Sequence, residues 1–395
     1  MPYWVYQDQD VLSSEFKNIY QGNAWHYLCL TSQLRDAGTY VTTDVGNVPV
    51  IVTRGEDNEF YAFENRCAHR GALLTTERCG HTKCFTCVYH AWTHNLEGDL
   101  IGVTFKDGIN GKGGMPKDFE MNKHSPRKME VVEYQGLLFG TFSENAPTFR
   151  EFVGARILGH IDRVIKSRTI EVLGQYTQTL PYNWKLYYEN VKDTYHASIL
   201  HLFFTTFGLN RLSQKGELVV NENGGCHVSL VRPLESEQAQ SVYKDEGLRT
   251  ESEYQLQAPQ FVEKINEFDD DIQLQILSIF PGFVLQQIRN TIAIRQVVPI
   301  NIGKTELRWT FIGFSDDSEE LRERRLLQNN LVGPSGYVSM EDGFVGNIVQ
   351  KGIRAAADFQ SVIQMGGHEA SSAPYRITEG GVRGMWKIYR NLMKI

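Results

Sequence analysis

The chain has 395 residues, a formal net charge of −7 and an isoelectric point near 5.9. Its Lys and Arg residues are scattered, which is not typical of a protein that binds nucleic acid. No uninterrupted apolar stretch approaches membrane-spanning length, and no charged leader precedes an apolar run at the N-terminus. We therefore expect a cytoplasmic protein, long enough for two domains or one unusually large one, with neither nucleic acid nor a membrane as its partner.

Strands dominate the predicted structure of residues 39–145. The preceding segment, residues 1–38, contains one short amphipathic helix, and we expect this segment to pack on a downstream domain. Apolar, β-branched residues at 48–53 and alternating residues at 59–64 predict a β-hairpin. Strand alternation returns at 128–142 and ends this β-rich region near residue 145.

Two Cys-His pairs follow the predicted hairpin, Cys67 with His69 and Cys87 with His90. Two thiolates on one iron and two neutral imidazoles on the other are the ligands of a Rieske 2Fe-2S cluster, whose reduction potential lies above that of an all-cysteine ferredoxin. The short spacing within each pair places it on its own loop. Two such loops facing each other can close over one cluster.

A structural zinc site is the alternative for this segment. Cys84 and Cys87 also read Cys-x-x-Cys, and Cys79 and His81 lie nearby. Zinc would make the matched positions of the two other histidines a coincidence. Of the six cysteines, four lie in this segment, which suits a metal site in a reducing compartment better than a disulfide framework.

The pattern becomes helical at residues 148–167, so we place a domain boundary between residues 145 and 146. An acidic run at 316–320 opens a further helix, and its charges are most simply a solvated face. The strands expected in this second domain are 169–180, 226–231, 274–280, 283–288, 291–298 and 306–314. Antiparallel strands segregated from helices favour an α+β fold.

A second candidate metal site lies in residues 183–201. On a helix, Glu189, Asp193 and His196 are four and three residues apart and share one face. His201 lies roughly 140° round the helix from His196, so the helix must end or loosen between them if both bind one ion. Two histidines and one carboxylate form the facial triad of non-haem iron(II) oxygenases. Structural histidines are the alternative.

Both motifs resemble those of one family, the large subunits of Rieske ring-hydroxylating oxygenases. The run Cys-Val-Tyr-His-Ala-Trp-Thr-His-Asn-Leu-Glu-Gly-Asp-Leu, which begins at Cys87, resembles the cluster loop, and Asp-x-x-His-x-x-x-x-His resembles the mononuclear iron motif. The resemblance covers essentially the whole chain. It implies that His196 and His201 bind iron and that Asp193 joins an iron-ligand histidine to a cluster-ligand histidine of a neighbouring subunit, here His90.

The third iron ligand comes from residues 333–350, a segment that resembles the corresponding family segment. The resemblance implies Asp342 as the ligand, with Glu341 as the near alternative. Without the resemblance, the two carboxylates are ordinary residues of a helix N-terminus, where they favour the helix dipole. Both interpretations can hold at once.

The family resemblance implies an all-β Rieske domain, residues 39–145, inserted before an α+β helix-grip catalytic domain, residues 146–395. The N-terminal segment, 1–38, would pack on the catalytic domain. It further implies a homotrimer, and relatives suggest a small beta subunit in an α3β3 assembly. No Gly-x-Gly-x-x-Gly follows a strand, so NADH must act through a separate reductase.

Within the family, the chain resembles members that act on aromatic carboxylates. The resemblance implies the addition of O2 to terephthalate to give a cis-dihydrodiol, with ring hydroxylation of anthranilate or salicylate as alternatives. Arg295 and Arg376 are candidates for the substrate carboxylates, because arginine offers two parallel donors, and either could instead form a surface ion pair. Aromatic residues that could wall a flat ring, or simply pack the core, are Phe203, Phe204, Phe207, Phe280 and Phe283.

Two other classes of protein fit parts of the sequence. A Rieske electron carrier without oxygenase activity would use the first motif and leave the second domain as a scaffold. A zinc-stabilised binding protein would use the cysteines alone.

Overall fold

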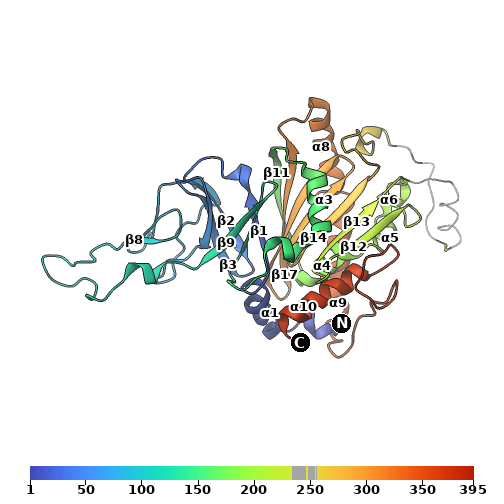
Figure 1. Ribbon diagram of the computed structural model, residues 1–395. Coiled ribbons are helices and arrows are strands. Elements are labelled where there is room, and N and C mark those ends of the chain that lie inside the picture. The colour runs from blue at the N-terminus through green and yellow to red at the C-terminus, as the bar shows by residue number, and fades with distance from the viewer. Residues whose placement is uncertain (234–245, 248–253, 255) are drawn as a thin grey trace. The chain divides into compact units, whose positions relative to one another are not determined.

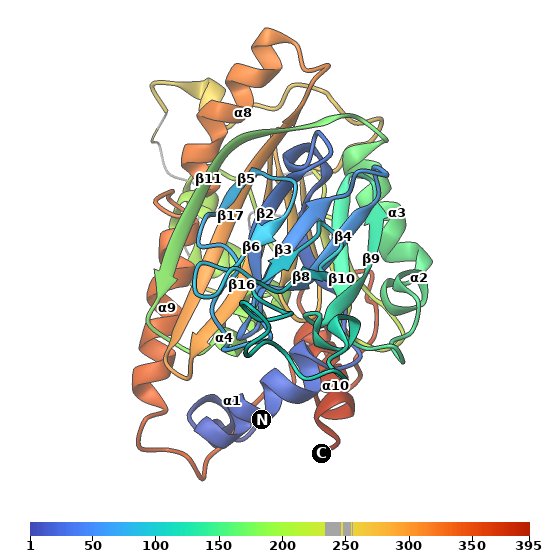
Figure 2. The ribbon, with the colours of Figure 1, turned by 90° about the vertical axis from the view of Figure 1, so that its left-hand side faces the viewer.

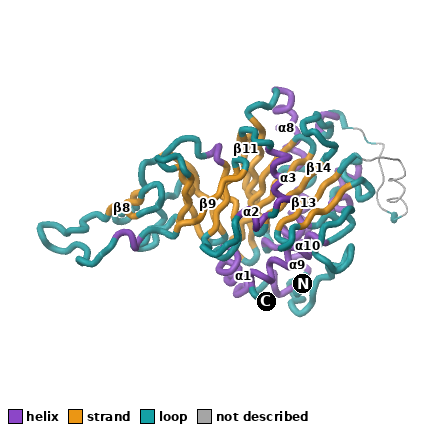
Figure 3. The backbone as a smooth tube through the Cα atoms, viewed as in Figure 1, coloured by secondary structure: helices purple, strands orange, loops and turns teal. Residues whose placement is uncertain are grey.

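The computed structural model describes residues 1–233, 246–247, 254 and 256–395, which form two compact units (Figure 1). The smaller unit comprises residues 20–146, and the larger unit comprises residues 1–19 and 147–395. Strands make up most of the regular structure of the smaller unit, whereas the larger unit combines a sheet with helices (Figure 3). The expected combination of a β-rich domain and an α+β domain is confirmed.

The smaller unit is built on a seven-stranded antiparallel sheet with the order β1-β10-β9-β4-β3-β2-β5 and a separate three-stranded sheet β6-β7-β8. The predicted hairpin is confirmed, because β3 and β4 pair in antiparallel register. The strands are β1 His26–Leu30, β2 Thr39–Val45, β3 Val48–Arg54, β4 Phe60–Glu64, β5 Cys79–His81, β6 Phe85–Thr86, β7 Thr93–His94, β8 Leu100–Gly102, β9 Lys128–Tyr134 and β10 Leu137–Thr141. A 3-10 helix, η3, spans Thr31–Gln33, and another, η4, spans Met121–His124.

Strand β1 corrects the expected boundary at residue 38. It pairs with β10, which places residues 20–38 in the smaller unit. All five residues of β1 are buried, so the strand has no polar face and shows none of the alternation that marked the others. Of the first 38 residues, only 1–19 belong to the larger unit.

These first residues are held to the larger unit by a buried carboxylate. They form η1 (Tyr3–Tyr6), α1 (Gln9–Glu15) and the start of a π-helical turn, η2 (Phe16–Tyr20). Glu15 is fully buried and accepts hydrogen bonds from Trp184 Nε1 at 2.8 Å, Lys185 Nζ at 2.6 Å and Tyr389 Oη at 2.6 Å. Helix α1 thereby lies beside the C-terminal helix α10, Gly380–Met393 (Figure 2).

The larger unit contains a second seven-stranded antiparallel sheet, with the order β11-β17-β16-β15-β14-β13-β12. Its strands are β11 Ile170–Leu180, β12 Gly216–Val220, β13 Cys226–Val231, β14 Leu274–Ile279, β15 Phe283–Ile288, β16 Thr291–Asn301 and β17 Lys304–Phe314. Its helices are α2 Phe149–Val153, α3 Ala155–Ile165, α4 Trp184–Lys192, α5 Ala197–Leu200, α6 Leu202–Thr206, η5 Pro259–Phe261, α8 Glu319–Val332, α9 Ser339–Gly352 and α10.

Helices cover both faces of this sheet. Helices α4 and α10 pack on one face and α9 packs on α4. Helix α3 covers the other face, where Gln275 Nε2 donates to the His160 carbonyl and Arg163 Nη1 donates to Gln287 Oε1. Because side chains alternate along a strand, the neighbours of Gln275 and Gln287 point toward the α4 face.

Two predicted helices differ in detail from the structure. The helix expected over 148–167 is divided at Gly154, whose φ of +86° favours glycine. The acidic run was expected to form a solvated face, but this is wrong for Asp317, whose side chain is 1% exposed. It accepts from Arg325 Nε at 2.8 Å and from Arg168 Nη2 at 2.7 Å. Within the described residues, no helix has the length and apolar character needed to cross a membrane.

Candidate metal centres and substrate pocket

The first predicted metal motif forms two loops with the same backbone hydrogen bonds. The Gly71 N–H donates to the Cys67 carbonyl at 2.9 Å, and the Ala91 N–H donates to the Cys87 carbonyl at 2.9 Å. Each cysteine N–H in turn donates to the carbonyl five residues later, at 2.8 Å. Gly71 and Ala91 both have positive φ, +73° and +53°. The two Cys-His pairs therefore sit on matching turns, as their spacing predicted.

The four predicted cluster ligands are arranged with sulfur inward and nitrogen outward. Cys67 and Cys87 are buried, and burial raises the pKa of the Cys67 thiol, with the adjacent Cys87 side chain adding to the effect. The rings of His69 and His90 lie 4.4 Å apart between centroids, and His69 stacks on Trp92 at 4.8 Å. Two buried thiols below two exposed or half-buried imidazoles fit the ligand set of a Rieske cluster.

The structure does not assemble the alternative zinc site. His81 Nε2 lies 3.0 Å from the Ala37 carbonyl oxygen, so this nitrogen is engaged with the backbone. Cys79 is exposed on β5. Across the described ranges, no group of three potential ligands around one position includes Cys79, His81 or Cys84. The same is true of the four predicted cluster ligands, but a cluster divides its ligands between two irons.

In the larger unit, helix α4 ends earlier than the sequence predicted. Asp193 has an extended backbone, with φ −85° and ψ 110°. Its Oδ1 atom accepts from the backbone N–H of Tyr195 at 2.7 Å and of His196 at 3.3 Å, which competes with helix formation. The break was expected between His196 and His201, but α4 already ends at Lys192, before both histidines. The expected shared helix face is therefore wrong. Glu189 instead accepts from Tyr6 Oη at 2.8 Å and from Trp386 Nε1.

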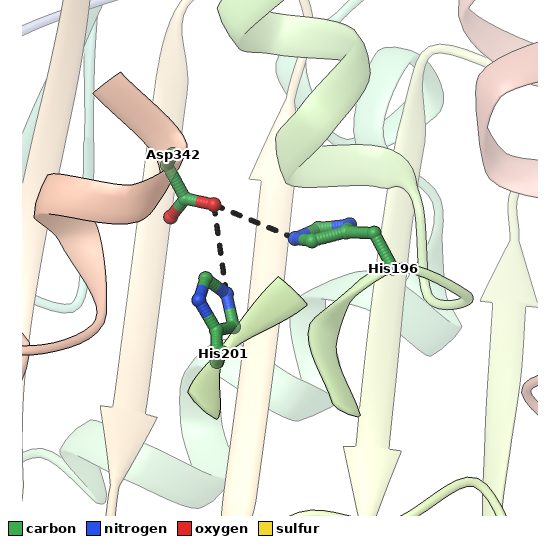
Figure 4. Close-up of side chains that lie close together, drawn as sticks. All are labelled: His196, His201 and Asp342. Carbon is green, nitrogen blue, oxygen red and sulfur yellow. Dashed lines mark ion pairs between the residues drawn. The ribbon is translucent and has the colours of Figure 1, made fainter. Parts of the chain in front are cut away.

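The break brings three predicted ligands together. His196 precedes α5, His201 lies between α5 and α6, and Asp342 lies in the first turn of α9. Asp342 Oδ1 is 3.5 Å from the Nε2 atom of each histidine. One potential ligand atom from each residue lies within 4.8 Å of the others. Figure 4 shows the three side chains converging from these separate segments.

The charges of this cluster suit a cation. Burial opposes the charged form of His196, but Asp193 and Asp342 outweigh burial and raise the pKa of His196 to about 10. Burial likewise opposes ionisation of Asp342, yet His201 and His196 lower the pKa of this carboxyl. An ionised buried carboxylate facing two imidazole nitrogens is a donor set for a divalent metal, which replaces the protons on binding.

Further side chains surround the triad. Asp193 Oδ2 lies 3.4 Å from His196 Nδ1, and Glu341 Oε2 lies 2.9 Å from His201 Nδ1. Asn190 Nδ2 donates to Asp342 Oδ1 at 3.0 Å. Sequence reasoning missed Asn190, although it precedes Asp193 by three residues in the same motif.

The triad opens into a pocket whose empty space, part of it open to solvent, is about 620 Å³. One wall is the α4 face of the sheet, where the lining residues alternate along β13, β14 and β15 as the pleat requires. Described lining residues from the sheet are Ser229, Val231, Leu274, Ile276, Gln286, Ile288 and Arg295. The sequence did not single out Ser229 and Gln286.

Both predicted substrate arginines line this pocket. Arg295 is 5% exposed, and its Nη1 donates to Tyr187 Oη at 2.7 Å. Among the described residues, no carboxylate forms an ion pair with Arg295. Arg376 is 2% exposed, and it donates to Asn210 Oδ1 at 2.7 Å and to the Arg211 carbonyl. Both side chains are buried, so neither lies on the surface where the alternative placed it.

The aromatic wall was predicted wrongly. Phe203, Phe207 and Phe283 are absent from the described pocket lining, and only Phe204 belongs to it. Phe203 packs on Phe207, the residue that caps α6, with ring centroids 4.7 Å apart, because residues four apart lie on the same side of a helical turn. Phe204 points elsewhere. Phe283 is buried at the start of β15, and Phe280 packs against Trp184 and Tyr188 in the core.

Comparisons with known proteins agree with both metal motifs. The model of the Rieske [2Fe-2S] domain matches residues 24–111, and that of the ring hydroxylating alpha subunit (catalytic domain) matches residues 164–395. The chain is 51% identical over 394 residues to the terephthalate 1,2-dioxygenase terminal oxygenase component subunit alpha 2 of Comamonas sp, covering 100% of this chain and 95% of that protein.

Other relatives extend the similarity. The anthranilate 1,2-dioxygenase large subunit of Burkholderia cepacia is 40% identical, with coverage of 100% and 93%. The salicylate 5-hydroxylase large oxygenase component of Ralstonia sp is 36% identical, with coverage of 100% and 94%. The naphthalene 1,2-dioxygenase structure from Rhodococcus sp. bound to indole has a TM-score of 0.81 at 21% identity and covers 100% of this chain and 94% of that chain. It supports the fold alone.

Proposed function

The chain belongs to the alpha subunits of ring-hydroxylating oxygenases, and from this premise we propose that it adds both atoms of dioxygen to terephthalate, giving a cis-dihydrodiol. It is the oxygenase component of a Rieske non-haem iron dioxygenase, with a 2Fe-2S cluster and a mononuclear iron as its metal groups. This membership removes the simple electron carrier and the zinc-stabilised binding protein as functions.

We assign the ligands from the motifs and their fit to the structure. Cys67, His69, Cys87 and His90 would hold the cluster. His196, His201 and Asp342 would hold the iron. When bound, the cluster supplies electrons and the ferrous ion supplies open positions for oxygen beside the substrate.

The observation that carries the substrate assignment is the presence of two buried arginines in the pocket of the triad. A guanidinium stays charged when buried, so an anionic partner stabilises it. Arg295 enters from β16, and Arg376 enters from the segment before α10, so each can bind a different carboxylate of one dianion. The apolar sheet residues and Phe204 can then contact the ring.

Monocarboxylates are the second candidate, because Arg376 already donates to Asn210 and to a backbone carbonyl. In that case Arg295 alone would bind the carboxylate of anthranilate or salicylate. The relatives at 40% and 36% identity act on such compounds by name.

We further propose a homotrimer in which Asp193 meets His90 of the partner subunit. Asp193 is partly exposed, with 23% of its side chain accessible, and its Oδ2 atom is available beside His196. A separate reductase would pass electrons from NADH, and a small beta subunit would complete the assembly. A cytoplasmic location is part of this proposal, and the six free cysteines suit a reducing compartment.

Steady-state turnover tests the proposed substrate. The purified oxygenase is supplied with a suitable reductase, NADH and terephthalate, benzoate, anthranilate or salicylate, and NADH oxidation and product are both measured. We expect kcat/KM to be highest for terephthalate and NADH oxidation to match diol formation. A higher kcat/KM for a monocarboxylate would contradict the terephthalate assignment.

A further inference from the structure

A second carboxylate lies beside the proposed iron site. Glu341 and Asp342 are neighbours in the first turn of α9, so their side chains point about 100° apart. Asp342 faces the Nε2 atoms of both ligand histidines. Glu341 faces the other nitrogen of His201, with Oε2 2.9 Å from Nδ1. The two carboxylates therefore face the two different nitrogens of the His201 ring.

We infer that Glu341 is a positioning residue, which accepts the Nδ1–H of His201 and thereby holds its Nε2 toward the iron. This inference rests on the proposed iron ligands. A neutral imidazole carries one proton, and an acceptor at Nδ1 keeps the proton there and leaves the Nε2 lone pair for a metal. A carboxylate acceptor also raises the basicity of the ligand nitrogen.

The second oxygen of Glu341 fixes the direction of this contact. Its Oε1 accepts from the Leu202 N–H at 3.3 Å, at the residue that follows His201. Both carboxylate oxygens thus bind the segment that carries the ligand. A side chain engaged at two points has little freedom to turn away from the imidazole.

The outer contact of the other histidine has a different geometry. Asp193 Oδ2 lies 3.4 Å from His196 Nδ1, and this nitrogen makes no hydrogen bond among the described residues. The Oδ1 atom of Asp193 is occupied by the backbone of its own turn. Glu341 therefore holds His201 through a contact within one chain, whereas the Oδ2 atom of Asp193 can still accept from a group of another subunit.

Glu341 also connects α6 to α9. A test must therefore separate this structural role from the role of Glu341 in orienting the His201 ring. Phe203 stacks on Tyr337 with ring centroids 5.0 Å apart and an interplanar angle of 9°. This stack joins α6 to the residue before the N-cap of α9, and it does not involve His201 Nδ1. Phe203→Leu is therefore a matched control that weakens the connection and leaves the carboxylate–histidine hydrogen bond in place.

Fe(II) affinity of the full-length protein, measured by chelator competition without substrate, tests the inference. We expect Glu341→Ala to raise the Fe(II) dissociation constant about 10- to 100-fold, and Glu341→Gln, which keeps one acceptor oxygen, to raise it less. We expect Phe203→Leu to bind Fe(II) within about twofold of the wild type. The absorption of the 2Fe-2S cluster reports in each variant that the smaller unit is loaded, and the melting temperature reports folding.

Three results would overturn the inference: wild-type Fe(II) affinity in Glu341→Ala, an equal loss of affinity in Phe203→Leu, or wild-type affinity in Asp342→Ala. The last result would also remove the proposed ligand set. Iron binding is measured without terephthalate, so failure of the substrate assignment leaves this result standing. If Glu341→Ala does not fold, Glu341→Gln decides the question: we expect a weaker Fe(II) affinity than wild type, and an unchanged affinity overturns the inference.

Discussion

The Nζ atom of Lys185 lies 2.6 Å from the Oε1 atom of Glu15, and both side chains are fully buried. This ion pair joins the N-terminal helix α1 to α4, the helix that leads into the iron motif. Trp184 and Tyr389 donate to the same carboxylate, so its charge is compensated by three donors. Desolvation offsets much of the attraction in such a pair. Removing one partner therefore lowers the stability of the fold more than removing both.

Lys185→Met should lower the free energy of unfolding by about 3 to 5 kcal/mol, because it leaves the Glu15 carboxylate buried without its cation. The double variant Glu15→Gln/Lys185→Met should lose less than the single variant. Lys166→Met is the control, because its pair with Asp269 is exposed and exposed pairs contribute about 0 to 1 kcal/mol. Denaturant titration of all variants tests this, and equal losses for Lys185→Met and Lys166→Met would contradict it.

Glu189 should make stability depend on pH. Burial raises its pKa from 4.5 to about 7, against the hydrogen bonds from Tyr6 and Trp386. Below pH 4.5 the carboxyl is protonated in both states. As the pH rises from 4.5 to 7 it ionises first in the unfolded chain, so this contribution to stability is lost, roughly 3 kcal/mol at most.

Glu189→Gln should remove that loss, because glutamine keeps an acceptor oxygen and has no charge to bury. We expect the variant to melt above the wild type at pH 8 and to show a much smaller difference at pH 5. Glu320→Gln, an exposed glutamate on α8, provides the control. A variant that melts below the wild type at pH 8 would show that the ionised carboxylate stabilises the fold.

Arg376→Ala should lower kcat/KM for terephthalate about 10- to 100-fold, the effect of one lost hydrogen bond to a charged group. We expect a much smaller loss for benzoate, which has no second carboxylate. Arg376→Lys keeps the charge and serves as the milder variant, and Arg322→Ala on the surface serves as the control. Equal losses for both substrates would show that Arg376 does not bind the second carboxylate.

Asp193→Asn should lower steady-state turnover at least about 10-fold, because the variant loses the negative charge beside His196. Asparagine keeps the Oδ1 acceptor for the Tyr195 and His196 N–H groups, so the turn is retained. Iron content and cluster absorption should match those of the wild type. Turnover within twofold of the wild type, or a fully active monomer, would contradict the proposed transfer between subunits.

The sequence was sufficient to predict site residues that can be recognised from the intervals between them. The matched Cys-His pairs are of this kind, whereas the family resemblance implied the domain order and the joint role of His196, His201 and Asp342. Helical periodicity predicted where α4 lies but not where it ends. The end depends on the Asp193 side chain accepting from its own backbone, which no periodic pattern records.

Contacts between segments that lie far apart in the chain could not be predicted from the sequence. Asn190 meets Asp342 across 152 positions and Glu341 meets His201 across 140. The four phenylalanines wrongly expected in the pocket are apolar whether they line a pocket or fill the core, so their residue type does not distinguish the two places. Strand β1 was missed because it is buried along its whole length.

A single-turnover experiment tests most directly whether the proposed iron site adds both atoms of dioxygen to terephthalate. The cluster and iron are first reduced, excess reductant is removed, and the enzyme is then given terephthalate and ¹⁸O-labelled dioxygen without a reductase. We expect a cis-dihydrodiol that carries two labelled oxygen atoms, and no product from Asp342→Ala with its cluster intact. A product with one labelled oxygen, or product formation by Asp342→Ala, would contradict dioxygenation at this iron site.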